Sequence, residues 1–244
     1  MKRAYFIFDG LKSSDYGVYI SAGMAFSDAE DDFEKVEIPG RSGDLIISKN
    51  RLKNRAGEYP AFIFASNAAE LSERVERFRN AIGSKSGYFR LFDSYNPGSY
   101  MIAAYAGGLK VDAKSRNRLA EFTIAFDCKP QRFLMSGESE IEYTEAGAIF
   151  NPTLFDAKPM IKVTGYGTLG LGDYSIEITG EAGMVTYIDC DMMEAYSLSG
   201  GAKVSRNAYI DTGPYFPVIK PGSNGITMDA TITKVAITPR WWKK

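Results

Sequence analysis

The stretch Thr231-Ile232-Thr233-Lys234-Val235-Ala236-Ile237 alternates polar and apolar side chains, and Pro239-Arg240-Trp241-Trp242 follows it closely. A period of two over such a run is typical of a half-buried β-strand. Both tryptophans of the chain stand at its end, and large aromatic rings bury much apolar area. We therefore predict that this strand closes the core of a β-domain and that at least one ring is buried. An exposed ring platform for a sugar, a base or a partner protein is the alternative.

Short apolar segments separated by Gly, Asn, Asp and Pro turns precede this strand. They cover residues 159–165, 174–179, 183–190, 208–211 and 226–237. This spacing is typical of a β-sandwich. Polar segments around Asn151-Pro152 come before them, and we therefore expect a domain boundary near 135–155. The predicted organisation is an N-terminal domain over residues 1–135, a linker over 136–155, and an all-β domain over 156–244.

The first half combines strand patterns with turn signals. The strand candidates are residues 3–9, 17–22, 33–39, 59–64, 99–111 and 119–128. A tight turn, Pro39-Gly40-Arg41-Ser42-Gly43-Asp44, leads into the apolar Leu45-Ile46-Ile47, with glycines that permit positive φ. The polar and basic segment 112–118 predicts the charged tip of a hairpin. Solvation explains its charges better than contact with phosphate.

One amphipathic helix is predicted over about residues 67–82. Asn67 can cap it, Glu70 is placed as a capping-box partner, and Gly83 can end it. Its apolar side chains fall on one face, at Leu71, Val75, Phe78 and Ile82. We expect that face to pack within its own domain, because most helical stability comes from such burial. The predicted fold class is mainly β with one helix: an α+β N-terminal domain followed by an all-β sandwich.

Composition narrows the classes of function. The chain has 244 residues and a formal net charge of −1, so no basic footprint predicts nucleic-acid binding. No stretch approaches the length of a membrane span, and we expect no membrane partner. The apolar run near the N-terminus is too short for a signal peptide. Only Cys128 and Cys190 are present, far apart, which fits a reducing compartment during folding rather than a disulfide framework.

The chain contains no histidine, which removes Ser-His-Asp and Cys-His catalysis and His-based zinc sites. The acidic clusters at 28–32 and 138–145 are interpreted as solvated faces, and Asp189-Cys190-Asp191 as acidic turn residues. Gly165-Tyr166-Gly167-Thr168-Leu169-Gly170 contains G-x-G-x-x-G without a following helix, so we interpret it as a β-turn segment. We predict no catalytic residue, no cofactor and no metal site.

Several motifs, taken in order, resemble the distal tail protein family of long-tailed, non-contractile bacteriophages. They are Phe8-Asp9-Gly10 with Ser14-Asp15-Tyr16-Gly17-Val18, then Ile38-Pro39-Gly40-Arg41-Ser42-Gly43-Asp44-Leu45, Phe126-Asp127-Cys128-Lys129-Pro130 with Arg132-Phe133, Tyr187-Ile188-Asp189-Cys190, Phe216-Pro217 with Pro221-Gly222-Ser223-Asn224, and Pro239-Arg240-Trp241-Trp242. Asp9 and Ser42 stand where asparagine is common in the family, and both residues suit turns. Each motif alone is weak, whereas six in order over the whole chain are much stronger.

The resemblance implies a virion protein of the tail tip, or baseplate, made and assembled in the cytoplasm of the bacterial host. Its N-terminal domain would build a ring, typically a homo-hexamer, and its C-terminal domain would be a galectin-like sandwich. The ring would bind the tail tube protein on one face and the tail-associated lysin or tail-tip protein on the other. Receptor-binding proteins involved in host adhesion would attach peripherally, and DNA would pass through the lumen without specific binding.

Ring and partner contacts are expected from strand edges and loops of the first domain and from the end of the chain. The candidate residues are Gly40, Arg41, Gly43, Asp44, Lys114, Arg116, Arg118, Arg240 and Trp242. One alternative is a carbohydrate-binding module that recognises the host cell wall, with Tyr209, Tyr215 or Trp241 stacking on sugars. Another is a carboxylate-based glycosidase, which would need two carboxylates across a cleft.

Overall fold

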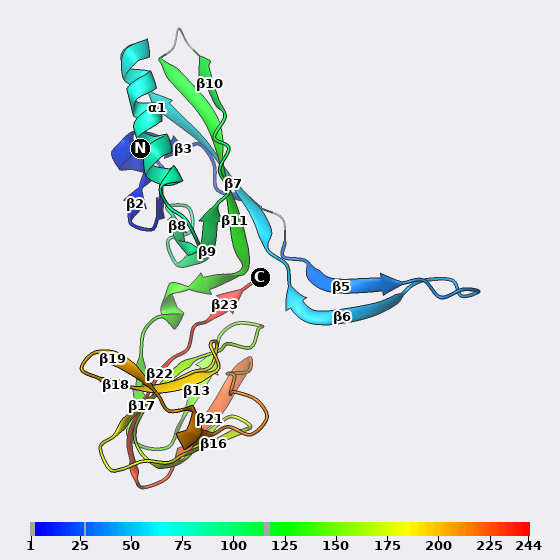
Figure 1. Cartoon of the computed structure of the whole chain (residues 1–244), viewed down its shortest axis with the longest axis vertical. Helices are drawn as coiled ribbons and strands as arrows, with labels where there is room; N and C mark the ends of the chain where they lie inside the picture. The colour runs from blue at the N-terminus through cyan, green and yellow to red at the C-terminus, as the bar shows by residue number, and fades with distance from the viewer. Residues whose placement is uncertain (1–2, 27, 115–117) are drawn as a thin grey trace. The chain divides into compact units, whose positions relative to one another are not determined.

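The computed structural model describes residues 3–26, 28–114 and 118–244 (Figure 1). The chain divides into two compact units, which are described separately. Unit 1 comprises residues 1–132 together with Lys244, and unit 2 comprises residues 133–243. Among the described residues, no helix combines the length and the apolar content needed to span a bilayer.

Unit 1 is built around one large curved sheet. Its strands are β1 (Phe6–Phe8), β2 (Leu11–Lys12), β3 (Val18–Ile20), β4 (Ala25–Phe26), β7 (Arg55–Phe64), β8 (Phe89–Asp93), β9 (Ser99–Tyr105), β10 (Val111–Lys114) and β11 (Leu119–Leu134). They follow the order β2-β1-β8-β9-β11-β7-β3, with β10 beside β11 and β4 beside β7. The N–H of Ile20 donates to the carbonyl of Ala4 at 3.0 Å, just before β1. This bridge joins the two ends of the sheet, which therefore closes like a barrel.

The core of unit 1 follows from the period of two in its strands. Along β7 and β11 alternate side chains are buried, including Tyr59, Ile63, Ile124 and Phe126. Phe6 and Phe8 of β1 point into the same core, where the rings of Phe8 and Phe126 lie 5.2 Å apart. The barrel interior is therefore filled with side chains.

The helix α1 (Ala68–Gly83) covers this core, and a 3₁₀ turn η1 (Ser13–Tyr16) lies beside it. The buried residues of α1 are Leu71, Val75, Phe78 and Ile82, as the sequence predicts. The side chain of Asn67 accepts from the N–H of Glu70 at 2.9 Å, and Glu70 accepts from the N–H of Ser66 at 2.8 Å. The helix ends at Gly83 with Ser84 in a right-handed conformation, so glycine supplies no left-handed cap.

Unit 2 contains two antiparallel sheets. Their strands are β12 (Ile141–Tyr143), β13 (Gly147–Asn151), β14 (Met160–Gly165), β15 (Gly167–Leu171), β16 (Tyr174–Ile178), β17 (Val185–Asp189), β18 (Glu194–Ser199), β19 (Ala202–Ser205), β20 (Ile210–Asp211), β21 (Gly222–Met228) and β22 (Ile232–Thr238). The last strand, β23 (Trp242–Lys243), belongs to neither sheet and pairs with β11. The 3₁₀ turns are η2 (Met135–Gly137) and η3 (Asn207–Tyr209). One sheet has the order β12-β22-β14-β17-β18-β19 and the other β13-β21-β15-β16-β20.

Both sheets contribute to one core. Ile161, Val163 and Val235 come from the first sheet, and Leu169 and Ile226 come from the second. Packing of two sheets through their apolar faces makes unit 2 a β-sandwich. The predicted fold class is therefore confirmed: the chain is mainly β, the described residues contain one α-helix, and the second half is an all-β sandwich.

The predicted linker over 136–155 is corrected by the structure. Within that range β12 pairs with β22, and β13 pairs with β21. Both are edge strands: Ile141 and Glu142 of β12 are exposed, whereas β13 buries Ile149 and Asn151. The division between the units falls between Arg132 and Phe133.

Two local interpretations of the second half also change. Residues 226–237 belong to two strands, β21 and β22. The glycine-rich segment at 165–170 lies mostly in strand β15 rather than in a turn. A Cβ atom on Gly165 would come within 2.2 Å of the carbonyl oxygen of Thr231, so glycine allows close approach of two backbones there.

Candidate interaction surfaces

The strands β5 (Asp31–Val36) and β6 (Leu45–Leu52) form a separate two-stranded sheet within unit 1 (Figure 1). The candidate residues Gly40, Arg41, Gly43 and Asp44 lie together in the turn that joins these strands, and all four are exposed. Gly40 has φ +78° and Gly43 has φ +87°, in the left-handed region that favours glycine. The turn motif therefore marks the tip of a hairpin.

The same hairpin exposes apolar side chains that were not among the sequence candidates. The exposed fractions are 40% for Phe33, 37% for Val36, 47% for Leu45, 61% for Ile46 and 48% for Ile47. Exposed apolar side chains gathered on one element are typical of an interaction site. In the sequence, the signal for these exposed side chains is the continuous apolar run at 45–47. A strand with one face in water would alternate apolar and polar residues instead.

The apolar side chains lie on both faces of the hairpin. Val36 pairs with Leu45, and Glu34 pairs with Ile47, so Val36, Leu45 and Ile47 share one face. Phe33 pairs with Ser48, and Lys35 pairs with Ile46, so Phe33 and Ile46 share the opposite face. A two-stranded ribbon with no sheet beside it gains little stability in water. The hairpin therefore has the features of an element completed by a partner.

Ion pairs hold the base of this hairpin. The Nε of Arg51 donates to Asp32 at 2.7 Å, and the Nζ of Lys49 lies 3.6 Å from the same carboxylate. Partial burial alone would raise the pKa of Asp32. The hydrogen bond from Arg51 and the charges of Lys49, Arg51 and Lys53 outweigh it and hold that pKa below its usual range. Asp32 therefore stays ionised and cross-links the two strands.

A second cluster connects the hairpin base to the barrel. The side-chain amide of Asn54 donates to Asp127 of β11 at 2.9 Å and to the hydroxyl of Tyr88 at 2.6 Å. The Tyr88 hydroxyl also donates to Asp127, and this hydrogen bond raises the pKa of Tyr88. Asn54 lies between β6 and β7, so these bonds tie the base of the hairpin to β11.

The basic candidates Lys114 and Arg118 lie in the β10–β11 hairpin and already make contacts within unit 1. Lys114 of β10 forms an ion pair with Glu121 of β11, and this partner raises the pKa of Lys114. Arg118 is exposed, and its carbonyl accepts from the N–H of Ala65 at 2.9 Å. Arg116 lies outside the described residues. The structure thus brings Lys114 and Arg118 together at one strand end, where the N–H of Arg118 donates to the carbonyl of Lys114 at 3.3 Å, whereas the turn at 40–44 belongs to a different hairpin.

The end of the chain makes contacts within unit 2. Trp241 is 4% exposed and belongs to the sandwich core. Trp242 stacks on Phe155 with ring centroids 4.4 Å apart, and its indole N–H donates to the carbonyl of Asp156 at 2.9 Å. The prediction of a buried ring is therefore correct for Trp241. The contacts of Trp242 within unit 2 reduce the surface of its ring that a partner could contact.

Arg240 is held by Asp189, a pairing that was not expected. Its two terminal nitrogens donate to the two carboxylate oxygens at 2.7 and 3.0 Å. Burial alone would raise the pKa of Asp189, but the bonds from Arg240 and from the N–H groups of Met192 and Asp191 lower it. The bond to Asp189 raises the pKa of Arg240 in turn. This pair cross-links the end of the chain to strand β17.

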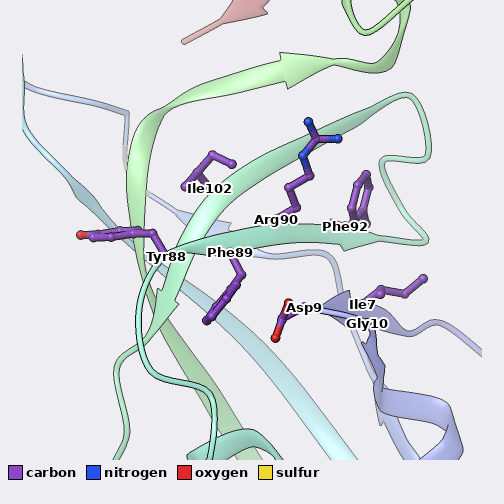
Figure 2. Close-up of a pocket in the computed structure, with 8 residues that line it drawn as sticks. All are labelled: Ile7, Asp9, Gly10, Tyr88, Phe89, Arg90, Phe92 and Ile102. Carbon is purple, nitrogen blue, oxygen red and sulfur yellow. The ribbon is translucent and has the colours of Figure 1, made fainter. Parts of the chain in front are cut away.

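Two hollows lie on the outside of unit 1. A depression of roughly 450 Å³ is lined mainly by apolar side chains from β1, β8 and β9, including Ile7, Phe92 and Ile102 (Figure 2). A groove of roughly 650 Å³ lies over β7, β10 and β11. Its charged lining residues are Glu58, Lys110, Asp112, Lys114 and Glu121.

Both cysteine side chains are buried. Burial raises the pKa of Cys128 to about 11 and that of Cys190 to about 12, so both stay protonated thiols near neutral pH. Within residues 3–26, 28–114 and 118–244, no three carboxylates or thiols are grouped as metal ligands. Of the rings considered for sugar stacking, Trp241 is buried, whereas Tyr209 and Tyr215 are exposed.

Comparison with known proteins gives matches in sequence and in fold. Residues 11–128 match the sequence model of the phage tail protein RIFT-related domain. No curated protein sequence matches the chain. The fold is similar to that of SPP1 Dit, described as a paradigm of the hub adsorption apparatus in phages that infect Gram-positive hosts. The TM-score is 0.77 at 16% identity, over 97% of this chain and 98% of that chain.

Two chains from the phage P2 baseplate in its activated conformation are also similar. The one solved with Ca has a TM-score of 0.50, and the one solved with Sr has 0.51. Both share 12% identity and cover 100% of this chain and 99% of theirs. At these identities the likeness concerns the fold.

Proposed function

Because residues 11–128 form a phage tail protein RIFT-related domain and the whole chain has the fold of the phage hub protein Dit, we propose that this protein is a ring-forming hub of a phage tail tip. Its copies close into a homo-oligomeric ring, a hexamer, at the end of a long non-contractile tail. The role requires assembly and no catalytic step.

The observation that carries this proposal is the β5–β6 hairpin. Five exposed apolar side chains on both of its faces are costly in a monomer and are stabilised when another chain covers them. The candidate turn with Gly40, Arg41, Gly43 and Asp44 lies at its tip. In the proposed ring this hairpin provides the main contact between copies.

The proposed partners follow the axis of the tail. One face of the ring binds the tail tube protein, and the other binds the tail-associated lysin or tail-tip protein. Receptor-binding protein attaches at the periphery, and DNA passes through the lumen without being held. The formal net charge of −1 supports such a passage, since a strongly basic channel would retain DNA.

The test is the size of the purified full-length protein. Light scattering over a range of concentrations, with electron microscopy of the same samples, should show closed rings with six-fold symmetry. Addition of the tail tube protein should stack or extend these rings. A strictly monomeric protein at all concentrations, also with its tail partners present, would rule out the proposal.

A carbohydrate-binding role is the second candidate, and the exposure of Tyr215 favours it. This ring is 74% exposed, whereas the guanidinium of Arg206 lies 4.6 Å over the ring of Tyr209. A sugar-binding unit 2 would lose retention on purified host cell wall when Tyr215→Ala is introduced. Equal retention of the variant and the parent protein would argue against this role.

A further inference from the structure

Arg206 is a buried cation of unit 2 without a counterion. It directly follows β19, and only 7% of the residue is exposed. A buried charge is costly unless it is paired, yet no carboxylate of the described residues forms an ion pair with Arg206. In the same unit, the guanidinium of Arg240 is neutralised by two hydrogen bonds to the carboxylate of Asp189. The fold therefore leaves the charge of Arg206 open to an anion from outside.

The hydrogen-bonding groups of Arg206 are only partly used. Its Nη2 donates to the carbonyl oxygen of Thr179, just after β16, at 2.6 Å. Its Nε is buried and has no hydrogen-bond partner among the described residues. Its Nη1 donates to none of these residues either, but it is not enclosed as Nε is. Because a guanidinium presents its N–H groups in a planar fork that fits carboxylate and phosphate oxygens, Nη1 can receive an oxyanion.

Exposed aromatic residues lie beside this guanidinium. Its central carbon lies 4.6 Å from the ring centre of Tyr209, a residue that is 50% exposed. A Cβ atom on Gly180 would lie 3.2 Å from Nη1 or Nη2 chemistry's bonded end, the Nη2 of Arg206, and 3.9 Å from the Cβ of Tyr166. Gly180 therefore keeps the space between Arg206 and Tyr166 small, and Tyr166 is 38% exposed. The unneutralised charge is thus flanked by two tyrosines that reach the surface.

These groups select the class of ligand. The guanidinium requires an oxyanion, whereas each tyrosine offers an apolar ring and a hydroxyl that can donate and accept. A sugar that carries a carboxylate or a phosphate has matching features, namely apolar C–H faces, hydroxyl groups and an oxyanion. An aspartate or glutamate of a partner protein would supply the oxyanion but no ring face for the tyrosines.

We propose that Arg206, together with Tyr209 and Tyr166, forms a site in unit 2 that binds an acidic saccharide. The proposal rests on the carbohydrate-binding role given above as the second candidate, and it names the site and the chemical class of the ligand. It does not depend on the formation of a ring.

Calorimetric titration of the full-length protein with glucuronic acid and with glucose 1-phosphate tests this site. The parent protein should bind at least one of them, and should bind neutral glucose at least about tenfold more weakly. Arg206→Gln should weaken binding of the acidic sugar at least about tenfold, because it removes a charge-assisted hydrogen bond. Tyr209→Ala should also weaken it without changing the charge. Lys110→Gln is the matched control, since it removes an exposed positive charge from unit 1 and should bind like the parent protein.

Thermal unfolding separates binding from a merely structural role. Arg206→Gln should unfold no more easily than the parent protein, because a buried charge without a counterion opposes folding. A loss of stability together with unchanged binding would show that Arg206 only joins the ends of β16 and β19. If Arg206→Gln does not fold, Arg206→Lys replaces it. This variant keeps the charge without the planar fork and should bind the acidic sugar more weakly.

The possible failures are distinguishable. If neither acidic sugar binds more tightly than glucose, or if Arg206→Gln binds them like the parent protein, the site is wrong. The carbohydrate-binding role would still stand if Tyr215→Ala lost retention on host cell wall. If inorganic phosphate or a glutamate-rich peptide binds as tightly as the acidic sugars, the ligand is not a saccharide. If no sugar binds and the parent protein is not retained on cell wall, both the role and the site are wrong.

Discussion

Arg240 fixes the end of unit 2 against strand β17. Its backbone has φ +59°, an uncommon value for a residue other than glycine. Its N–H donates to the carbonyl of Gly137 at 2.8 Å, and its guanidinium makes the bidentate pair with Asp189. The side chain of Asp189 is 8% exposed. This burial makes the pair sensitive to the loss of either partner.

Asp189→Asn should lower the free energy of unfolding of unit 2 by about 2 kcal/mol, because Arg240 keeps its charge and loses its counterion. Chemical denaturation followed by tryptophan fluorescence measures this change. Asp191→Asn is the matched control, since Asp191 is 58% exposed and lies 3.4 Å from Lys158. A surface pair of this kind contributes about 0–1 kcal/mol. Equal effects of the two substitutions would contradict the structural role of Arg240.

The same pair should give a dependence on pH. The folded pKa of Asp189 lies below the ordinary value of 3.8, so the unfolded chain binds the proton first as the pH falls. The stabilisation is complete above that ordinary value and is lost as the pH falls through the lower folded pKa. The difference between parent protein and Asp189→Asn should therefore shrink in acid. A constant difference across this window would contradict the assignment.

Gly137 is a second sensitive position in unit 2. A Cβ atom there would lie 2.3 Å from the backbone nitrogen of Trp241, a distance that forces the two segments apart. Gly137→Ala should cost about 1–3 kcal/mol in unfolding free energy, as overpacking does. Gly98→Ala is the control, because a Cβ at Gly98 meets no atom within 4 Å. Denaturant titration of both variants checks this difference.

At the scale of elements, we expect the β5–β6 hairpin to be needed for assembly but not for folding of unit 1. None of the residues of β5 or β6 belongs to the described core cluster of unit 1. Replacing residues 33–48 with a short Gly-Ser turn should therefore leave the midpoint of thermal unfolding nearly unchanged and abolish rings. Calorimetry and light scattering measure the two effects. A large loss of stability would show that the hairpin is needed for folding.

The helix and this hairpin show why some elements can be predicted and others only in part. The face of α1 was predicted correctly because its apolar period and its cap are local properties of the chain. The turn at 40–44 was also placed correctly, because glycine and proline restrict the backbone locally. The exposure of Phe33 and Ile46 was not predicted, since an apolar run alone cannot show whether another layer covers it.

At the scale of the whole molecule, the two units have separate cores. The core cluster of unit 2 includes residues from Ile149 to Trp241, with Leu134 packed against it. A fragment of residues 133–243 should therefore unfold cooperatively by itself, with a midpoint close to that of unit 2 in the full chain. Calorimetry of the fragment and of the full protein checks this. A fragment without a transition would contradict the division into units.

The resemblance to distal tail proteins is confirmed by the domain match over 11–128 and by the fold shared with SPP1 Dit. It rested on ordered turn motifs, which report backbone geometry along the whole chain. The ring, its six-fold symmetry and its partners remain proposals, because they depend on surfaces of other molecules.

Local patterns of side chains were sufficient to predict a mainly β chain, one helix, a sandwich in the second half and a buried tryptophan. These features follow from periods of two and 3.6 residues and from turn chemistry, which act over a few residues. Folding in three dimensions was needed to close the barrel through Ala4 and Ile20, to pair Asp189 with Arg240, and to put β12 and β13 into the sandwich. Such contacts join residues far apart in the chain, and their energy depends on distances and burial that no local pattern contains.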